Sequence, residues 1–150
     1  RMIVMQFPPP QFRMKKEGEK AFVFDGIRKR WLLLTEEEWV RQNFVAYLQT
    51  AMRYPSALIA LEKELALNGL KKRFDILVYD NHHQPWLMVE CKAPSVSLSE
   101  EVLQQALRYN MAVPVKYIVI TNGEKTMGWE KNGTDLALLH ALPAFAHAEE

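Results

Sequence analysis

Two apolar runs stand in the middle of the chain, from Phe74 to Tyr79 and from Trp86 to Val89. The polar residues DNHHQP between them are typical of a turn, so the pattern predicts a β-hairpin. Both runs are apolar at successive positions, and therefore on both faces of a strand. Helices are accordingly expected to cover the sheet on two sides.

A first helix is predicted from the stretch TEEEWVRQ. Thr35 is a suitable N-cap, and Glu38 at the third helical position completes a capping box for a helix that runs to about Met52. At 100° per residue Glu37 lies on the apolar stripe, whereas Glu38 turns toward solvent and interacts favourably with the helix dipole. The apolar stripe consists of Val40, Phe44, Tyr47, Leu48 and Ala51.

A second helix is predicted to begin at a capping box of Ser97 and Glu100 and to run to about Met111. Its buried stripe consists of Leu98, Val102, Ala106 and Tyr109. Gln105 falls within that stripe, and a buried amide without partners costs on the order of 1 to 3 kcal/mol. Its partner is expected to be either a backbone carbonyl or the sheet face that carries Lys92.

Hairpins are predicted at both ends of the chain. Gly18 marks a turn between QFRM and AFVF, Asp25 begins a second turn through its side chain, and the Asn-Gly pair at Asn132 marks a third. Residues 1–10, with three consecutive prolines, are expected to form an arm, and residues 143–150 a frayed tail. Further strands are expected at residues 31–34, 57–64, 116–121, 125–130 and 135–139.

The whole chain, residues 1–150, is predicted to form one α/β domain with a mixed sheet in the order helix, three strands, helix, strand. A hydrophobic content of 49% and a charged content of 25% are those of a globular protein. No apolar run approaches the roughly 18 residues of a membrane span, so we expect a cytoplasmic protein without membrane contact. The net charge of +1 lacks the basic excess of a domain that grips nucleic acid by charge alone. Basic clusters at residues 13–16 and 28–30 are expected to be solvated.

The central hairpin brings three chemically active side chains together. If its turn is centred on His82 and His83, antiparallel register sets Asp75 opposite Glu90, with Cβ atoms roughly 4.5 to 5.5 Å apart. Lys92, two residues beyond Glu90, shares their face. Two carboxylates at that distance repel each other unless a cation lies between them. Mg²⁺ or Mn²⁺ suits this position, and a plain cross-strand salt bridge is the alternative.

Other reactive residue types are less informative. The single cysteine, Cys91, excludes an internal disulfide and is expected to point to the opposite face as a small core residue. The basic run of Lys71, Lys72 and Arg73 adjoins Asp75 and is either a contact for phosphates or a solvated strand entry. Zinc is not expected, because no metal-ligand spacing joins the histidines. These are His82, His83, His140 and His147.

Asp75 together with Glu90, Cys91 and Lys92 resembles the D…ExK signature of the PD-(D/E)XK nuclease superfamily. The surrounding sequence resembles the N-terminal nuclease domain of type I restriction enzyme R (motor) subunits. The matching pieces follow the family's order and cover roughly two thirds of the chain. They are FDGIRKRWLLLT (24–35), EEEWVRQ (36–42), RFDILVYD (73–80), PWLMVECKAP (85–94), QQALRYN (104–110) and ITNG (120–123).

The resemblance implies a restriction-endonuclease-like fold and a metal-dependent DNA endonuclease. Asp75 and Glu90 would be the metal ligands, with a backbone carbonyl near Cys91 as a candidate further ligand. Lys92 would position or activate the attacking water and offset charge in the transition state.

The resemblance also implies supporting residues. Gln105 and Tyr109 match the spacing of a glutamine and a tyrosine in the family's active site, where Gln105 would orient Lys92 or a water. Glu37 matches the acid that such nucleases often supply from the first helix. Glu62 matches a family position as well, although cross-strand pairing with a lysine accounts for it equally well.

Two other hypotheses for the function are retained. These 150 residues contain no GxxxxGK[ST] phosphate loop, so no translocating motor is encoded here, and further subunits of a restriction-type complex are candidate partners besides DNA. The second hypothesis is therefore a catalytically silent nucleic-acid-binding or partner-docking module with the same fold. A third, an enzyme unrelated to nucleic acid, predicts a deep apolar pocket instead of an open acidic cleft.

Overall fold

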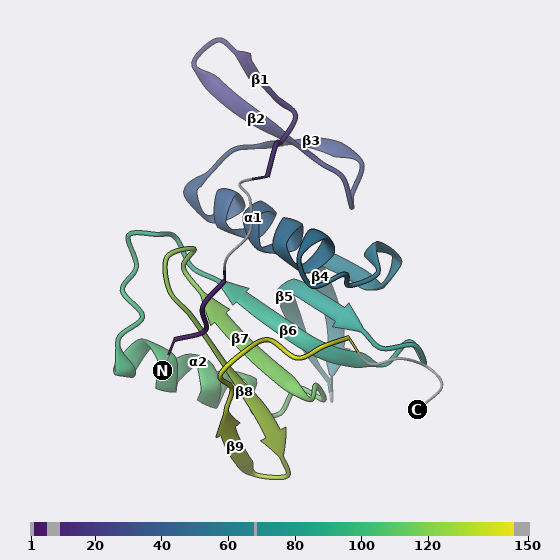
Figure 1. Cartoon of the computed structure of the whole chain (residues 1–150), viewed down its shortest axis with the longest axis vertical. Helices are drawn as coiled ribbons and strands as arrows, with labels where there is room; N and C mark the ends of the chain where they lie inside the picture. The colour runs from purple at the N-terminus through teal and green to yellow at the C-terminus, as the bar shows by residue number, and fades with distance from the viewer. Residues whose placement is uncertain (1, 6–9, 68, 146–150) are drawn as a thin grey trace.

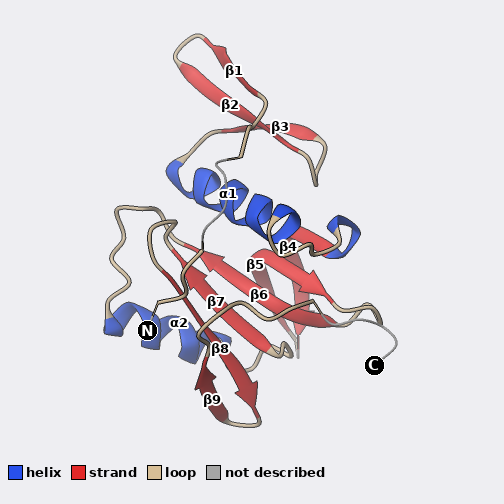
Figure 2. Cartoon of the chain, viewed as in Figure 1, coloured by secondary structure: helices blue, strands red, loops and turns tan. Residues whose placement is uncertain are grey.

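A computed structural model describes residues 2–5, 10–67 and 69–145 of the chain. This part contains a six-stranded sheet, a three-stranded sheet and two α-helices (Figures 1 and 2). The predicted order of helix, three strands, helix and strand is confirmed, with a hairpin at each end. The elements are β1 (Met14–Glu17), β2 (Lys20–Asp25), β3 (Arg30–Leu33), α1 (Glu36–Thr50), the 3₁₀ turn η1 (Ser56–Leu58), β4 (Ile59–Leu67), β5 (Leu70–Tyr79), β6 (Pro85–Cys91), α2 (Glu100–Asn110), β7 (Tyr117–Thr121), β8 (Thr126–Asn132) and β9 (Asp135–Leu138).

The six-stranded sheet has the strand order β4-β5-β6-β7-β8-β9. Its neighbours run antiparallel except β6 and β7, which are parallel because α2 carries the chain back between them. The predicted central hairpin is formed by β5 and β6, with Ile76 opposite Val89. One further step in this register sets Asp75 opposite Glu90, as the predicted turn centre requires.

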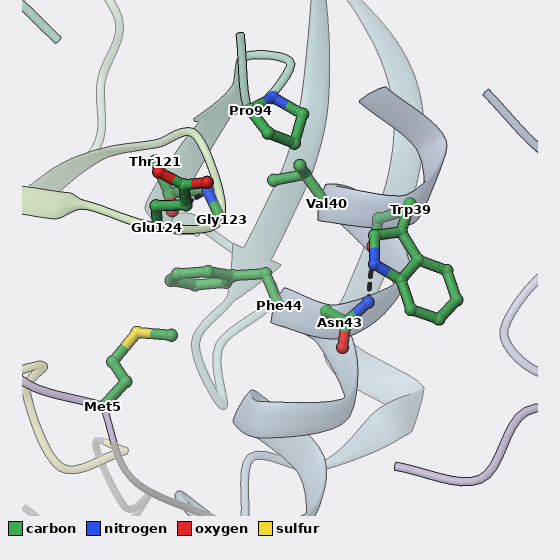
Figure 3. Close-up of a pocket in the computed structure, with 9 residues that line it drawn as sticks. All are labelled: Met5, Trp39, Val40, Asn43, Phe44, Pro94, Thr121, Gly123 and Glu124. Atoms are coloured by element: carbon green, nitrogen blue, oxygen red, sulfur yellow. Dashed lines mark hydrogen bonds between the residues drawn. The ribbon is translucent and has the colours of Figure 1, made fainter. Parts of the chain in front are cut away.

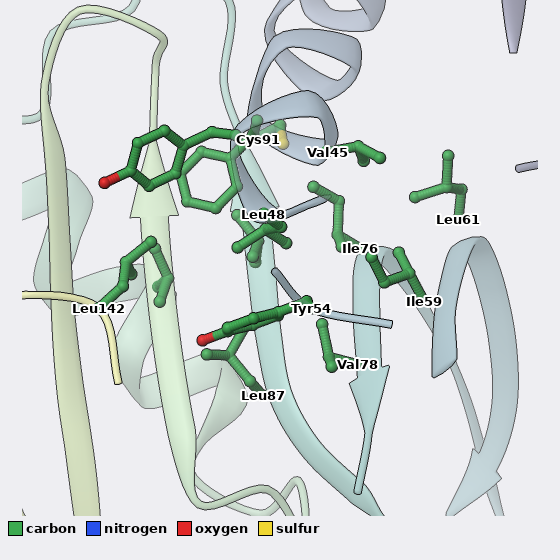
Figure 4. Close-up of a cluster of buried hydrophobic side chains, with 14 of the residues drawn as sticks. Val45, Leu48, Tyr54, Ile59, Leu61, Ile76, Val78, Leu87, Cys91 and Leu142 are labelled. Atoms are coloured by element: carbon green, nitrogen blue, oxygen red, sulfur yellow. The ribbon is translucent and has the colours of Figure 1, made fainter. Parts of the chain in front are cut away.

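One helix covers each face of the six-stranded sheet, which confirms the predicted two-sided arrangement (Figure 1). Within the described residues, no helix is long and apolar enough to cross a membrane. On the α1 side the core includes Val45, Leu48, Ile76, Val78 and Leu87 (Figure 4). On the α2 side it includes Leu77, Met88, Ala106, Ile118 and Ile120. Burial of such a side chain stabilises the fold by about 1.5 to 3 kcal/mol, so these two layers hold β5 and β6 firmly.

The helix α1 begins at its predicted cap, where Thr35 Oγ1 accepts a hydrogen bond from the Glu38 backbone N–H at 3.0 Å. The predicted stripe is buried at Val40, Phe44, Tyr47 and Leu48. Ala51 is exposed, because α1 ends at Thr50. The prediction that Glu38 faces solvent is wrong, since Glu38 is 7% exposed while the Glu37 side chain is 51% exposed. The reason is that the turn after β2 covers a second face of α1.

Asp25 connects the three-stranded sheet to α1 through side-chain hydrogen bonds. Its Oδ1 accepts the backbone N–H groups of Ile27 and Arg28, both at 2.8 Å, which is the predicted side-chain turn. Its Oδ2 accepts from Arg28 Nε at 2.6 Å and from Gln42 Nε2 at 2.9 Å. Gln42 belongs to α1, so a fully buried carboxylate joins the two parts of the fold.

Acid is expected to destabilise the fold through Asp25. Burial alone raises the pKa of this carboxyl, but the hydrogen bonds from Arg28 outweigh burial and lower it below the ordinary value of 3.8. Such a group stabilises the native state above its unfolded pKa, and this contribution is lost as pH falls through the lower folded pKa. The measurement is urea unfolding of the natural chain and of Asp25→Asn between about pH 6 and pH 2.5. Below about pH 4 the free energy of unfolding should fall more steeply in the natural chain than in Asp25→Asn.

The matched control for this measurement is Glu19→Gln, which removes an exposed acid from the turn between β1 and β2. It should follow the natural chain at every pH. If Asp25→Asn also does so, Asp25 contributes nothing to acid unfolding.

The helix α2 is capped by Ser99 and not by the predicted Ser97, since Ser99 Oγ accepts the Val102 N–H at 3.2 Å. The capping-box spacing fits Ser97 with Glu100 alone, because the third residue after Ser99 is Val102, so this signal indicated the wrong serine. The helix itself begins at Glu100, as the structure assigns it.

The predicted stripe of α2 is wrong at two positions. Gln105 is exposed, and Tyr109 is 67% exposed, whereas Ala106 and Asn110 are the buried pair. These two are four residues apart and therefore share the face that packs on the sheet. Tyr109 is rotated about 100° from Asn110, which turns its ring to the edge of that face.

The N-terminal segment contributes to the core. Ile3 is 6% exposed, and its backbone N–H donates to the Thr126 carbonyl at 2.8 Å. The prediction of an arm is therefore wrong for this residue, because an apolar side chain meets the edge of the sheet here. Most of the proline run lies in residues 6–9, outside the described residues.

The predicted frayed tail is wrong for residues 143–145. The Phe145 ring lies 5.6 Å from that of Tyr54 and 5.3 Å from that of Trp86, between ring centroids. Tyr54 Oη donates to the Pro143 carbonyl at 2.6 Å. Aromatic burial fixes this segment, while His147 lies outside the described residues.

Candidate active site

The predicted triad of Asp75, Glu90 and Lys92 lines one cleft, beside the middle of β5 and the C-terminal end of β6. The cleft has a volume of about 230 Å³ and is bounded by Glu37 from α1 and Asn110 from α2. The side chains of Asp75, Glu90 and Lys92 are 23%, 22% and 33% exposed. All three therefore reach the same solvent-filled space, as the hairpin register predicts.

Both oxygens of Asp75 have partners. Oδ2 accepts the Cys91 backbone N–H at 2.8 Å, which ties β5 to β6 beyond their last ladder pair. Oδ1 accepts from Arg41 Nη2 at 2.9 Å. Arg41 comes from α1 and was not among the residues predicted for the site.

Arg41 is a buried cation, 2% exposed, in the middle of several acids. Besides Asp75 it pairs with Glu38, and its Nη2 lies 2.8 Å from Glu62 Oε2 and 3.4 Å from Glu37 Oε1. Burial opposes its charge, but the hydrogen bond to Asp75 and the surrounding acids raise the pKa of Arg41. The guanidinium is therefore charged, although its buried Nε has no partner among the described residues.

The sequence does carry a signal for Arg41. It follows Glu37 by four residues and precedes Phe44 by three, so it belongs to the same stripe. A charged residue at such a position must find buried partners. Arg41 is missed when only the apolar residues of the stripe are considered.

Glu62 is the neighbour of Asp75 on the other side. The pairs on either side, Leu61 with Ile76 and Lys63 with Phe74, leave Glu62 opposite Asp75, although these two are not themselves a ladder pair. Glu62, Asp75 and Glu90 therefore form a row across three strands. For Glu62 the alternatives were a family site position and pairing with a cross-strand lysine. The structure provides two arginines in place of a lysine, Arg41 and Arg73, the latter at 2.5 Å. Glu62 also has φ +52°, a left-handed conformation that costs a β-strand residue about 1 to 3 kcal/mol.

Glu90 is held from two sides. Its Oε2 lies 3.0 Å from Lys92 Nζ, and its Oε1 accepts from Asn110 Nδ2 at 3.2 Å. Asn110 is 1% exposed and also donates to the Ala106 carbonyl at 2.8 Å. Asn110 was not predicted, although an amide four residues beyond a small buried residue indicates a polar contact on the packed face.

Glu37 is in the position predicted for a first-helix acid. It lines the cleft with Asp75 and Lys92. Partial burial, followed by the negative charge of Asp75, raises the pKa of Glu37 above its ordinary value of 4.5. Its carboxylate is therefore a more basic oxygen donor than an isolated glutamate.

Gln105 and Tyr109 line a second cleft, of about 310 Å³, which they share with Glu90 and Lys92. Although both are exposed, the structure brings them to the predicted site. The Lys72 ammonium lies 3.7 Å from the centroid of the Tyr109 ring and fixes one side of that ring.

The basic run beside the site is divided among different contacts. Lys71 is exposed, Lys72 donates to the Tyr109 carbonyl at 2.5 Å, and Arg73 pairs with Glu62. The Arg73 side chain is 64% exposed and lines the cleft. Its role in contacting phosphates stays a prediction.

Cys91 is 2% exposed and packs in the core on the α1 side, as predicted. Burial raises the pKa of its thiol well above the ordinary value, so the side chain is a neutral core residue. No three His, Cys, Asp or Glu side chains are arranged to hold a metal ion in the part of the chain that the structure describes. Instead, Arg41 and Lys92 neutralise the carboxylates of the cleft.

An apolar cavity of about 300 Å³ lies apart from these carboxylates (Figure 3). It lies between α1, the loop after β6 and the turn between β7 and β8. Its apolar walls come from Met5, Trp39, Val40, Phe44 and Pro94. The triad does not line it, so the acids and the lysine occupy an open polar cleft and not a deep apolar pocket.

The element order and the cleft define a restriction-endonuclease-like α/β domain with two acids and a lysine beside the middle of β5 and the C-terminal end of β6. A family model described as type I restriction enzyme R protein N terminus matches residues 36–143. The chain therefore belongs to this family, and the membership supports a function of the nuclease type. The three-stranded sheet β1 to β3 precedes the matched residues.

Two solved structures are similar at low sequence identity. One is the cryo-EM structure of a DrdV–DNA complex, with a TM-score of 0.43 and 15% identity over 68% of this chain and 10% of that chain. The chain thus spans about a tenth of that protein's length. The other is a "putative nuclease belonging to DUF820" from Anabaena variabilis, with a TM-score of 0.47 and 9% identity over 84% of this chain and 80% of that chain. No curated protein matches significantly.

Proposed function

We propose that this domain hydrolyses DNA phosphodiesters with a divalent cation, Mg²⁺ or Mn²⁺, as an endonuclease of the restriction type in the cytoplasm. The observation that carries the proposal is the convergence of Asp75, Glu90 and Lys92 on one open cleft. Family membership supports DNA as the substrate. Further subunits of a restriction-type complex would supply translocation, for which these 150 residues carry no phosphate loop.

The chemistry of the donors in the cleft suits a hard cation, although the described side chains are not arranged around one. Asp75 and Glu90 present carboxylate oxygens from adjacent strands, which are the ligands that Mg²⁺ prefers. Glu37, with its raised pKa, and Glu62 are further oxygen donors beside them. A cation at Asp75 would either use the remaining lone pair of Oδ2, which accepts the Cys91 N–H, or replace Arg41 on Oδ1.

When bound, a divalent cation would lower the pKa of a water and polarise the scissile phosphate. The protein side chains would stabilise the developing charge and position the reacting groups. Lys92 would carry a positive charge to the phosphate oxygens as negative charge develops on them. Asn110 would hold Glu90 in place through its 3.2 Å hydrogen bond. Gln105 and Tyr109, at the rim of the adjoining cleft, would orient Lys92 and the substrate.

The test is a nicking assay on supercoiled and single-stranded DNA. Nicking is expected with Mg²⁺ or Mn²⁺, and none is expected with EDTA or with Asp75→Asn, which removes one carboxylate charge. The matched control is Asp135→Asn, an exposed acid at the start of β9, and it should cleave like the natural chain. Cleavage that survives both EDTA and Asp75→Asn would contradict the proposal.

One observation favours the second candidate, a silent module that binds DNA or a partner without turnover. Arg41 satisfies Asp75 and Glu62 from inside the fold, as a resident cation would. In that case Mn²⁺ would not bind. Calorimetric titration of the protein with Mn²⁺ therefore distinguishes the two functions without an activity assay, because binding is expected for the nuclease and none for the silent module.

A further inference from the structure

The three-stranded sheet has one face of aromatic and basic side chains. Its register sets Lys15 opposite Phe22 and Phe22 opposite Leu33. One pair further along, Phe24 is opposite Trp31. Directly opposed residues share a face, as do residues two apart on one strand. Glu17 and Lys20 lie at one end of this face, where Glu17 Oε2 pairs with Lys15 Nζ at 3.0 Å. The rest of it, the aromatic face, consists of Arg13, Lys15, Phe22, Phe24, Trp31 and Leu33.

This face is open to solvent in part. Val23, which lies between Phe22 and Phe24 and so points to the opposite face, is fully buried. The rings of Phe22, Phe24 and Trp31 are only partly buried, and Leu33 is 48% exposed. The end of the face that carries Arg13 and Phe24 continues into a groove of about 230 Å³ along α1. The three-stranded sheet lies beside α1 (Figure 1). Its partly exposed apolar side chains are within reach of a ligand.

The rings and cations of the face are already arranged in stacks. The Phe24 and Trp31 rings meet edge to face at a centroid distance of 5.4 Å. The Arg13 guanidinium lies 4.5 Å from the centroid of Phe24, and Lys15 Nζ lies 4.6 Å from a ring centroid of Trp31. Nucleobases stack on aromatic rings and on guanidinium planes, and ammonium groups attract the adjoining phosphates.

The charge of this segment differs from that of the rest of the chain. Residues 13–30 hold seven Lys and Arg against three acids, whereas the whole chain holds 19 against 18. Asp25 pairs with Arg28 and Glu17 pairs with Lys15, which leaves five Lys and Arg against one acid. The excess of positive charge is therefore concentrated on the three-stranded sheet, where it complements a polyanion.

We propose that the aromatic face binds single-stranded nucleic acid. Bases stack on Trp31 and the neighbouring phenylalanines, and phosphates contact Arg13 and Lys15. Duplex DNA does not meet this requirement, because its bases are stacked on one another and unavailable to the rings. The inference is independent of the cleavage proposed above, since the face lies outside the cleft and needs no metal.

The test is fluorescence anisotropy of a labelled oligothymidylate in EDTA, which prevents metal-dependent cleavage. Trp31→Leu is expected to weaken binding about 10-fold, because one stacked base loses its ring. The matched control is Trp39→Leu, which removes a tryptophan of α1 that is 40% exposed and lies outside the aromatic face. Binding by this control should equal that of the natural chain.

A second variant and a second probe distinguish a loss of base stacking from a folding defect of Trp31→Leu. Lys15→Gln leaves the rings in place and should lower the slope of log Kd against log salt by about 1. An abasic strand of equal length keeps the phosphates and loses the bases, so it should bind about 10-fold more weakly or worse. Equal binding of the abasic strand, or binding that Trp31→Leu and Trp39→Leu reduce alike, would overturn the proposal, as would no binding of oligothymidylate.

Discussion

Replacing Lys92 with methionine is expected to slow metal-dependent nicking of plasmid DNA about 10²- to 10³-fold. The methionine keeps most of the stem and removes the charge that would offset negative charge on the phosphate. The Lys92 side chain is one-third exposed, and Glu90 remains held by Asn110 after the change. The variant should therefore fold normally, and the loss should lie in the rate of the chemical step.

The matched control is Lys116→Met. Lys116 is a surface lysine that also faces a glutamate, Glu130, at 3.8 Å, but lies outside the cleft. It should nick at the natural rate. Lys92→Arg is expected to stay impaired, since a planar guanidinium does not present its charge as a compact ammonium does. Nicking by Lys92→Met at the rate of Lys116→Met would exclude a role for Lys92 in the reaction.

The position of the triad was predictable because the register of a hairpin determines which residues are opposite each other. Once the turn centre is known, the side-chain period of two fixes which residues share a face. Asp75 and Glu90 follow from that rule, and Lys92 follows from Glu90. The apolar positions on both faces of the two strands likewise predicted a helix on each side, which the two cores confirm.

The surroundings of the triad were less predictable, because they depend on contacts between elements distant in sequence. Glu38 is buried only because the turn at Asp25 and Arg28 lies against α1. The exposure of Tyr109 follows from the rotation of α2, which packs Ala106 and Asn110 on the sheet instead. An apolar stripe identifies the face of a helix that meets one partner, and α1 has two. The buried acids and arginines between the two sheets therefore escaped the pattern.

Arg41→Met is expected to reduce the free energy of unfolding by about 3 kcal/mol, as measured by urea denaturation at neutral pH. Arg41 is the shared partner of Asp75, Glu62 and Glu38. Without it, acids from α1, β4 and β5 would face one another with their repulsion uncompensated. Glu38 would keep Arg28 and Gln42, so the cost arises mainly between α1 and the two strands.

Arg73→Met provides the matched control, because both arginines pair with Glu62 but differ in burial. The Arg41 side chain is 3% exposed and that of Arg73 is 64% exposed. An exposed pair is screened by water and contributes at most about 1 kcal/mol, so Arg73→Met should unfold close to the natural chain. Equal losses in the two variants would mean that the number of ion pairs matters here and their burial does not. A larger loss for Arg41→Met would identify this buried arginine as the cation that holds the acidic row together.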